Sequence, residues 1–171
     1  MTPASAVTPY VAVVGPSDAT PEQAGDARDV GRRLASAGAV VVCGGLGGVM
    51  HAVAQGCAEA GGVSIGLLPG DDRSAASPLL TVAVATGIGE ARNALVVRAS
   101  DVVVAIAGGF GTLSEIGFAL RIGRPVIGLG TWDLTRPGRP APIESARDTA
   151  DAVERALALA RRSTRRDAAL S

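Results

Sequence analysis

Two short stretches of the chain carry residues whose types and spacing could bind and act on an anion. The first holds Arg92 and Asn93, and the second is a glycine-rich turn, residues 107–115, that ends at Glu115. The turn follows the apolar run 102–106 and precedes apolar residues at helical spacing, which predicts strand, loop and helix. Glycines let the backbone approach a ligand closely, and the first N–H groups of a helix attract negative charge. The pattern therefore predicts a phosphate site beside a carboxylate.

A second glycine loop, residues 44–48, lies between another apolar strand pattern and another helical one. Ligands of a doubly wound sheet bind beyond the carboxyl ends of its strands, so the glycine loops should meet at one edge. The predicted catalytic pair is Arg92 and Glu115. The predicted ligand- and phosphate-binding residues are Gly15, Ser17, Gly44, Gly45, Gly47, Gly48, Asn93, Gly108, Gly109, Phe110, Gly111 and Thr112.

Several of these residues also have a purely structural interpretation. Thr112 and Glu115 stand at the Thr-x-x-Glu spacing of a capping box, so both could serve only to cap a helix. Arg92 could close an ion pair at a helix start. His51 and Trp132, each near a predicted loop, could contact a ligand or merely pack.

Other phosphate and cofactor chemistries do not fit the sequence. The second loop lacks the G-x-G-x-x-G spacing and a following acidic residue, so a nicotinamide dinucleotide is not expected. The chain has no lysine, which removes both a Walker loop and a lysine Schiff base to pyridoxal phosphate. Cys43 and Cys57 lack the spacing of a metal or redox pair, so no metal is expected.

The same residues resemble a known family. The stretch Ala107-Gly-Gly-Phe-Gly-Thr-Leu-Ser-Glu115 resembles the P-G-G-x-G-T-x-x-E motif of the LOG (LONELY GUY) cytokinin-activating proteins, long mislabelled as lysine decarboxylases. The segment Glu90-Ala-Arg-Asn-Ala94 resembles the E-R-K segment that precedes that motif. Ala107 replaces the motif proline and Asn93 replaces the lysine. In these respects the chain is more similar to the branch of the molybdenum-cofactor carrier proteins.

The resemblance leaves two functions open. One is a carrier or binding protein for a phosphorylated ligand, an AMP-like nucleotide or the molybdenum cofactor, favoured by Ala107 and by Asn93, which would contact a polar edge of the ligand. The other is a phosphoribohydrolase that cuts the N-glycosidic bond of AMP or a cytokinin riboside monophosphate. There Glu115 would stabilise positive charge on the sugar or position water, and Arg92 would orient Glu115 or hold the substrate. The resemblance also implies a homodimer or larger homo-oligomer.

The elements that must position these residues follow from the hydrophobic pattern. Helical spacing and cap residues predict helices at 21–37, 49–60, 90–99, 112–122 and 145–162, with a proline-rich loop at 135–142. Continuous apolar runs predict buried strands at 10–14, 39–43, 63–68, 80–85, 102–106 and 125–129. This alternation predicts an α/β fold, a three-layer α/β/α doubly wound and mainly parallel sheet that is Rossmann-like and LOG-like. We expect a single domain at residues 10–162 between a disordered tail, 1–9, and a flexible tail, 163–171.

Composition restricts the partners and the compartment. The 16 basic and 16 acidic side chains balance, so we expect no large basic surface for nucleic acid. The amino-terminal segment has no signal-peptide pattern, and no apolar run reaches the roughly 18 to 20 residues that cross a bilayer. The sequence therefore predicts a cytoplasmic protein that binds no membrane.

Overall fold

The computed structural model describes residues 7–168, so the parts of the predicted tails at 1–6 and 169–171 lie outside the described residues. Seven parallel strands form one sheet in the order β4-β3-β2-β1-β5-β6-β9. Their bounds are β1 (Tyr10–Val14), β2 (Val40–Cys43), β3 (Val63–Leu68), β4 (Val82–Ala85), β5 (Val102–Ile106), β6 (Val126–Leu129) and β9 (Ile143–Ser145). The predicted doubly wound parallel sheet is confirmed.

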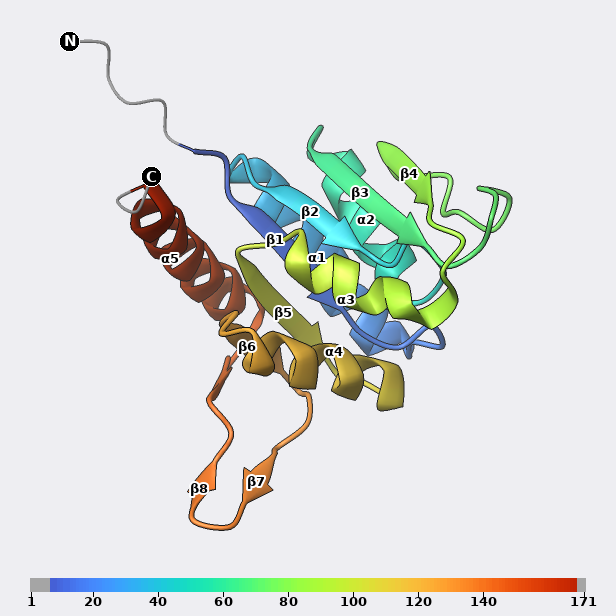
Figure 1. The fold of residues 1–171 in the computed structure, drawn as a ribbon. Coiled ribbons are helices and arrows are strands. Elements are labelled where there is room, and N and C mark those ends of the chain that lie inside the picture. Colours follow the sequence, from blue (N-terminus) through green and yellow to red (C-terminus); the bar gives the residue numbers. More distant parts are fainter. Residues whose placement is uncertain (1–6, 169–171) are drawn as a thin grey trace, which may run out of the picture.

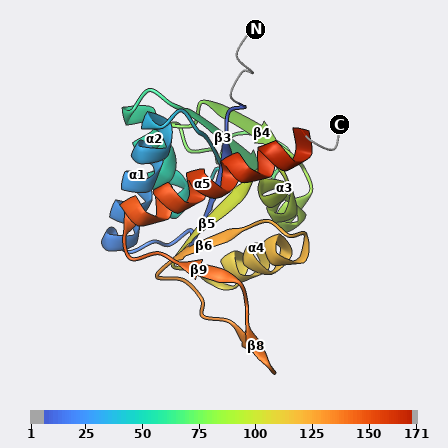
Figure 2. The ribbon, with the colours of Figure 1, turned by 90° about the vertical axis from the view of Figure 1, so that its left-hand side faces the viewer.

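Helices cover both faces of the sheet, as Figures 1 and 2 show. One layer consists of α1 (Pro21–Ser36), α2 (Val49–Glu59) and α5 (Thr149–Ala168). The other consists of α3 (Arg92–Arg98), preceded by the short 3-10 turn η1 (Gly89–Ala91), and α4 (Phe110–Arg121). The predicted three-layer arrangement in a single domain is therefore also confirmed.

The sheet separates two hydrophobic clusters, one beneath each helix layer. All five residues of β5 are buried, and alternate side chains enter opposite clusters, Val102 and Val104 on the α1, α2 and α5 side and Val103 on the α3 and α4 side. A strand that is covered on both faces reads as a continuous apolar run, because neither set of side chains meets water. This is why the run before the glycine turn was readable as a buried strand.

The carboxyl-terminal quarter departs from the sequence prediction. Residues 143–145 form the edge strand β9 beside β6, and its last residue, Ser145, is where the helix was expected to begin. The helix begins at Thr149 because Asp148 caps it, accepting a hydrogen bond from the Asp151 amide at 2.8 Å. It runs through Ala168, beyond the expected end at residue 162. The predicted proline-rich loop contains a small antiparallel hairpin of β7 (Thr135–Arg136) and β8 (Arg139–Pro140), which projects from the body (Figure 1).

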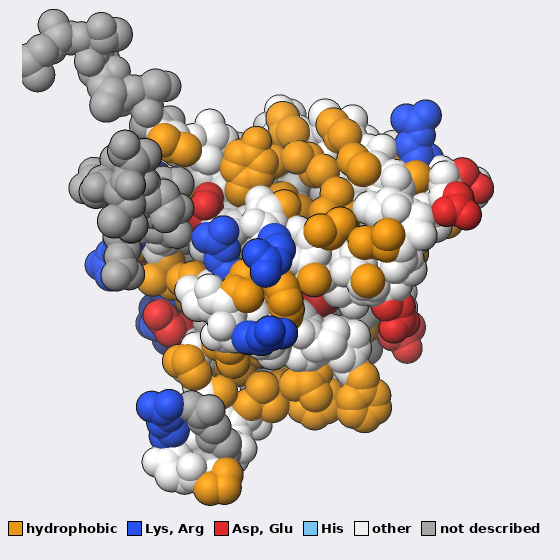
Figure 3. Space-filling view, viewed as in Figure 1, with side chains coloured by type: hydrophobic (Ala, Val, Ile, Leu, Met, Phe, Trp, Pro, Cys, Tyr) orange, Lys and Arg blue, Asp and Glu red, His pale blue; other side chains and the backbone are white. Residues whose placement is uncertain are grey.

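The α3 and α4 layer leaves part of the sheet without a helix. The connection from β3 to β4 contains no helix, and the side chains of Val63, Val82, Val84 and, on α3, Leu95 are each about two-fifths exposed. Figure 3 shows hydrophobic side chains gathered over β3 and β4 on this face. We call Val63, Val82, Val84 and Leu95 the bare sheet face. Within residues 7–168, no helix is both long enough and apolar enough to cross a membrane.

Candidate functional site

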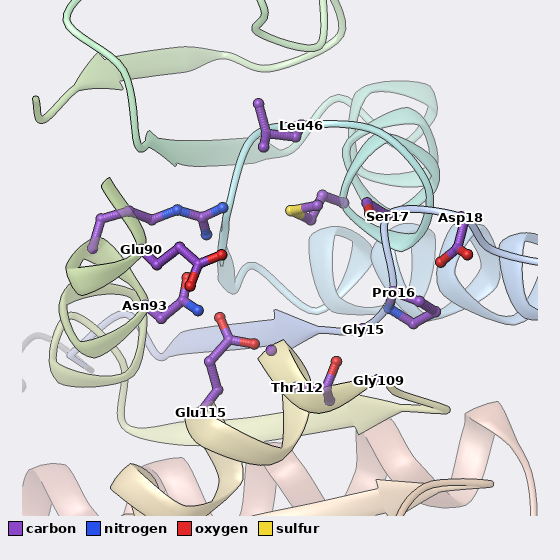
Figure 4. Close-up of a pocket in the computed structure, with 13 residues that line it drawn as sticks. Gly15, Pro16, Ser17, Asp18, Leu46, Glu90, Asn93, Gly109, Thr112 and Glu115 are labelled. Atoms are coloured by element: carbon purple, nitrogen blue, oxygen red, sulfur yellow. The ribbon is translucent and has the colours of Figure 1, made fainter. Parts of the chain in front are cut away.

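A pocket of about 280 Å³ opens where the strand order reverses, beyond the carboxyl ends of β1 and β5. Chain segments diverge from this point, so a crevice forms there and ligands of such sheets bind in it. The pocket is lined by eight of the predicted residues, namely Gly15, Ser17, Arg92, Asn93, Gly109, Gly111, Thr112 and Glu115 (Figure 4). The sheet thus brings together residues from the loop after β1, from α3 and from α4.

Glu115 lies on α4, and its carboxyl group points into the pocket on the side where Glu90 and Asn93 lie (Figure 4). Its side chain is buried, at 7% exposed, and it has no hydrogen bond or ion pair within residues 7–168. Burial raises the pKa of Glu115 to about 7, against the attraction of Arg92, which lowers it. Titratable groups shifted toward neutral pH by burial are typical of binding and catalytic sites.

Arg92 begins α3 and is equally buried, at 7% exposed. Its Nε atom has no hydrogen-bond partner in the described part of the chain. Desolvation lowers the pKa of Arg92, and the nearby Glu115 carboxylate opposes that shift. The two side chains do not come within the 4.0 Å of an ion pair, and no ion pair of Arg92 occurs within residues 7–168. The structural ion pair considered as an alternative for Arg92 is therefore not formed.

The capping-box interpretation of Thr112 and Glu115 is wrong. Helix α4 begins at Phe110, with Gly109 as its N-cap and no side-chain hydrogen bond to the cap. Both residues therefore lie inside the helix rather than at the positions a capping box needs. The free N–H groups of the first turn, Phe110, Gly111 and Thr112, have no partner in the described chain and face the region of the pocket.

The left-handed backbone of this turn is at Ala107 and Gly108, with φ of 50° and 137°, and not at Gly109, whose φ is −94°. A Cβ added to Gly108 would lie 2.7 Å from the Thr112 Cβ, whereas one added to Gly109 would meet nothing within 4 Å. Gly108 is therefore required by the backbone and by Thr112. At Gly109 neither the backbone nor a neighbouring described atom requires glycine.

Ala107 is held in its left-handed conformation by the end of β6. Its N–H donates to the Leu129 carbonyl at 3.0 Å, and its own carbonyl accepts a hydrogen bond from the Thr131 hydroxyl. Non-glycine residues occupy this region at a cost, and they persist there when neighbouring groups fix them. The conformation is closed to proline, whose ring sets φ near −65° and whose nitrogen has no hydrogen to donate.

The glycines of the second loop support the pocket rather than lining it, although Leu46 between them does line it. A Cβ on Gly44 would lie 2.1 Å from Nη1 of Arg92, so Gly44 makes room for that guanidinium. Gly45 packs against Gly66 of β3. Gly48 has a φ of 60° and touches the Pro16 carbonyl, to which the Val49 N–H donates at 3.0 Å. The predicted residues that do not line the pocket are Gly44, Gly45, Gly47, Gly48, Gly108 and Phe110.

The structure adds five lining residues that the sequence did not single out as ligand-binding: Pro16, Asp18, Leu46, Met50 and Glu90. Leu46 and Met50 provide an apolar wall. Asp18 and Glu90 add two exposed carboxylates. The sequence did hold a signal for two of them. Glu90 belongs to the segment that resembles the family motif, and Asp18 directly follows the predicted Ser17, so both could have been predicted to lie near the ligand.

His51 and Trp132 are not among the residues that line the pocket, and each has a hydrogen-bond partner in the chain. His51 Nδ1 lies 2.9 Å from the Ser77 hydroxyl. Trp132 donates from Nε1 to the Gly109 carbonyl at 3.3 Å, and its ring lies 6.0 Å from that of Phe110, which is 82% exposed. Within residues 7–168, no group of His, Cys, Asp and Glu side chains is placed to hold a metal ion.

Comparison with known proteins assigns the chain that forms this pocket to a family. The model of the SLOG cluster4 family matches residues 8–161, most of the chain. The chain belongs to the SLOG cluster4 family. This confirms the LOG-like superfamily that the two motifs indicated. An uncharacterised protein of Archaeoglobus fulgidus is 37% identical over 119 residues, which are 70% of this chain and 78% of that protein.

Solved structures similar to this SLOG protein support the molybdenum-cofactor carrier branch. The molybdenum cofactor binding protein from Rippkaea orientalis is 33% identical, with a TM-score of 0.81 over 88% of this chain and 96% of that one. The molybdenum cofactor carrier protein from Chlamydomonas reinhardtii is 31% identical, with a TM-score of 0.74 over 89% and 98% of the two chains. The fold and the branch agree with what Ala107 and Asn93 suggested.

Proposed function

We propose that the protein is a carrier or binding protein for a phosphorylated small molecule of nucleotide or pterin type, with the molybdenum cofactor as a candidate cargo. This proposal rests on the side chains of Arg92 and Glu115, which are both buried in one pocket, form no ion pair with each other and have no hydrogen-bond partner in the part of the chain that the structure describes. Burying two such charges is costly unless something pairs with them, so a ligand between them would supply what the chain lacks.

The pocket has parts that match such a ligand. The free N–H groups at the start of α4 and the loop that carries Ser17 suit a phosphate group. Leu46 and Met50 suit the face of a flat ring, and Asn93 suits a polar ring edge. Proteins named as molybdenum-cofactor carriers share the fold at more than 30% identity, which supports the molybdenum cofactor as cargo.

Ala107 favours the carrier over the hydrolase. The LOG motif has proline at this position, and the φ of 50° found here excludes proline. The turn before the proposed phosphate site therefore has a backbone conformation that a turn with the motif proline cannot adopt. Asn93 in place of the motif lysine points the same way.

A phosphoribohydrolase is the second candidate, and Glu115 is the observation that favours it. A buried carboxyl with a pKa of about 7 has the acidity of a general acid or base at neutral pH. Such a group could position water or stabilise charge on a ribose held beside Arg92. Neither role uses a metal or a lysine.

One experiment separates the two functions. Purified protein is incubated with AMP, with a cytokinin riboside monophosphate and with molybdenum cofactor released from a molybdoenzyme, and both binding and free base are measured. A carrier binds at least one of these ligands and releases no base. Release of base with turnover would replace the carrier by the hydrolase, and absence of binding to all three would contradict both.

We also propose that the protein forms a homodimer or larger homo-oligomer through the bare sheet face. Both faces of a parallel sheet are normally covered, and here Val82, Val84 and Leu95 remain exposed. A twofold contact would place the Glu90 end of α3 in one copy near the Arg98 end in the other, so the charges are self-complementary. A monomeric mass by light scattering at micromolar concentration, unchanged in Val84→Glu, would contradict this.

A further inference from the structure

The pocket is not the positively charged site that a phosphate ligand would ordinarily select. Arg92 is the one basic side chain among its described lining residues, against the carboxyl groups of Asp18, Glu90 and Glu115. Asp18 and Glu90 are exposed and can be screened by water, but Glu115 is buried. A dianionic ligand held at the start of α4 would meet the Glu115 carboxylate in a water-poor space, where like charges repel strongly.

Within residues 7–168, no group neutralises Glu115 by direct contact. The ionisable groups that act on it are Arg92 from α3 and Cys43 from β2, and Glu90 and Asp18 also line the pocket. Arg92 attracts it without forming an ion pair, and the Cys43 thiol, whose pKa burial raises to about 11, stays neutral. The carboxyl group therefore has both oxygens available to a ligand.

We propose that Glu115 carries a proton when the pocket holds an anionic ligand and donates a hydrogen bond to it, so that ligand binding takes up one proton from solvent. A protonated carboxyl group is a donor, whereas an ionised one only accepts, so the proton converts repulsion into a hydrogen bond. No bond is made or broken apart from the O–H bond formed. The inference rests on the proposed function, because it concerns the same ligand in the same pocket.

The consequence is a ligand that is held more weakly as the pH rises. Because the carboxyl titrates near pH 7, about half of the empty protein is protonated at pH 7 and about a tenth at pH 8. The phosphate of AMP has already lost its second proton over most of this range, since its pKa is about 6. The AMP affinity should therefore fall about fivefold between pH 7 and pH 8.

Titration calorimetry of AMP in buffers of different ionisation enthalpy tests this. At pH 8 the parent protein should take up close to one proton per AMP bound. Glu115→Gln, which keeps a donor without a titrating group, should bind AMP with no uptake and with the same affinity at pH 7 and pH 8. Asp18→Asn removes an exposed carboxylate from the same pocket and should keep the proton uptake.

The outcomes separate this inference from the proposed function. Binding of AMP without proton uptake, or uptake that survives in Glu115→Gln, overturns the protonated Glu115 and leaves the binding function in place. Uptake that disappears in Asp18→Asn instead assigns the proton to Asp18 and also overturns the inference. No AMP binding at any pH from 6 to 8 overturns this inference, and the binding function is then decided by the other two ligands.

Discussion

Replacing Glu115 by Gln should stabilise the empty protein at alkaline pH and leave it unchanged at acid pH. An ordinary glutamate has a pKa of 4.5, and burial raises that of Glu115 to about 7. Between these values the native protein holds a proton that the unfolded chain has lost. The free energy of unfolding therefore falls as the pH rises from about 4.5 to 7, and the loss then stays constant.

The pKa difference sets the size of the effect. A difference between 4.5 and about 7 corresponds to about 3 kcal/mol at most. Water that enters the pocket reduces this, so we expect about 1.5 kcal/mol or more at pH 8. For a chain of this length that is an increase in Tm of about 3 to 6 °C.

Thermal unfolding of both proteins at pH 5, 6, 7 and 8 measures the difference. Other shifted groups are common to both proteins, so their effects on the difference in Tm cancel. Asp29 is an example: desolvation raises its pKa, but hydrogen bonds from Arg33, Thr149 and Arg32 lower it to about 2. Glu90→Gln, at an exposed position of the same pocket, is the matched control and should follow the parent at every pH. Parallel Tm curves for the parent and Glu115→Gln would refute the buried, unpaired carboxylate.

Three further substitutions test the geometry of the pocket. Gly109→Val should fold normally, because its φ of −94° suits any residue, and calorimetry should show AMP binding reduced at least tenfold by a side chain in the open pocket. Gly44→Ala should displace the Arg92 guanidinium and weaken AMP binding at least tenfold. Its control is Gly47→Ala, which should leave AMP binding unchanged because an added Cβ there meets only a carbonyl oxygen, at 3.5 Å. Ala107→Gly should raise the free energy of unfolding by about 0.5 to 1 kcal/mol in urea, because glycine relieves the left-handed strain. An unchanged or lower stability would contradict that strain.

The sequence was sufficient for the sheet and for the core of the site because both depend on local pattern. A short run of β-branched apolar residues such as that of β5 favours a doubly covered strand, and the turn after it lies at the point where the strand order reverses. Arg92 and Glu115 could be placed at one pocket because each lies near a predicted element boundary at the same edge of the sheet.

The sequence was insufficient to predict the role of a residue when that role depends on a neighbour far away in the chain. Gly44 was assigned to the ligand, but its lack of a side chain is required by Arg92, which comes from another layer. The glycine pattern of the turn gave no sign that the non-glycine residue Ala107 has a positive φ, which depends on its contacts with the end of β6. The strand β9 has only three residues, too few for a periodic signal, and the Asp148 cap after it went unrecognised.

The conformation of Ala107 also limits which residue this position can accept. An alanine codon becomes a proline codon by a single base change, so the hydrolase motif is one mutation away in the gene. In the protein that mutation would lose the hydrogen bond from the Ala107 N–H to Leu129 and force the turn out of its left-handed conformation. The segment that carries Thr131 would have to be rebuilt before the proline became acceptable. A protein that changed from this turn to the proline turn would therefore pass through a less stable form, although the two turns differ in sequence at this one position.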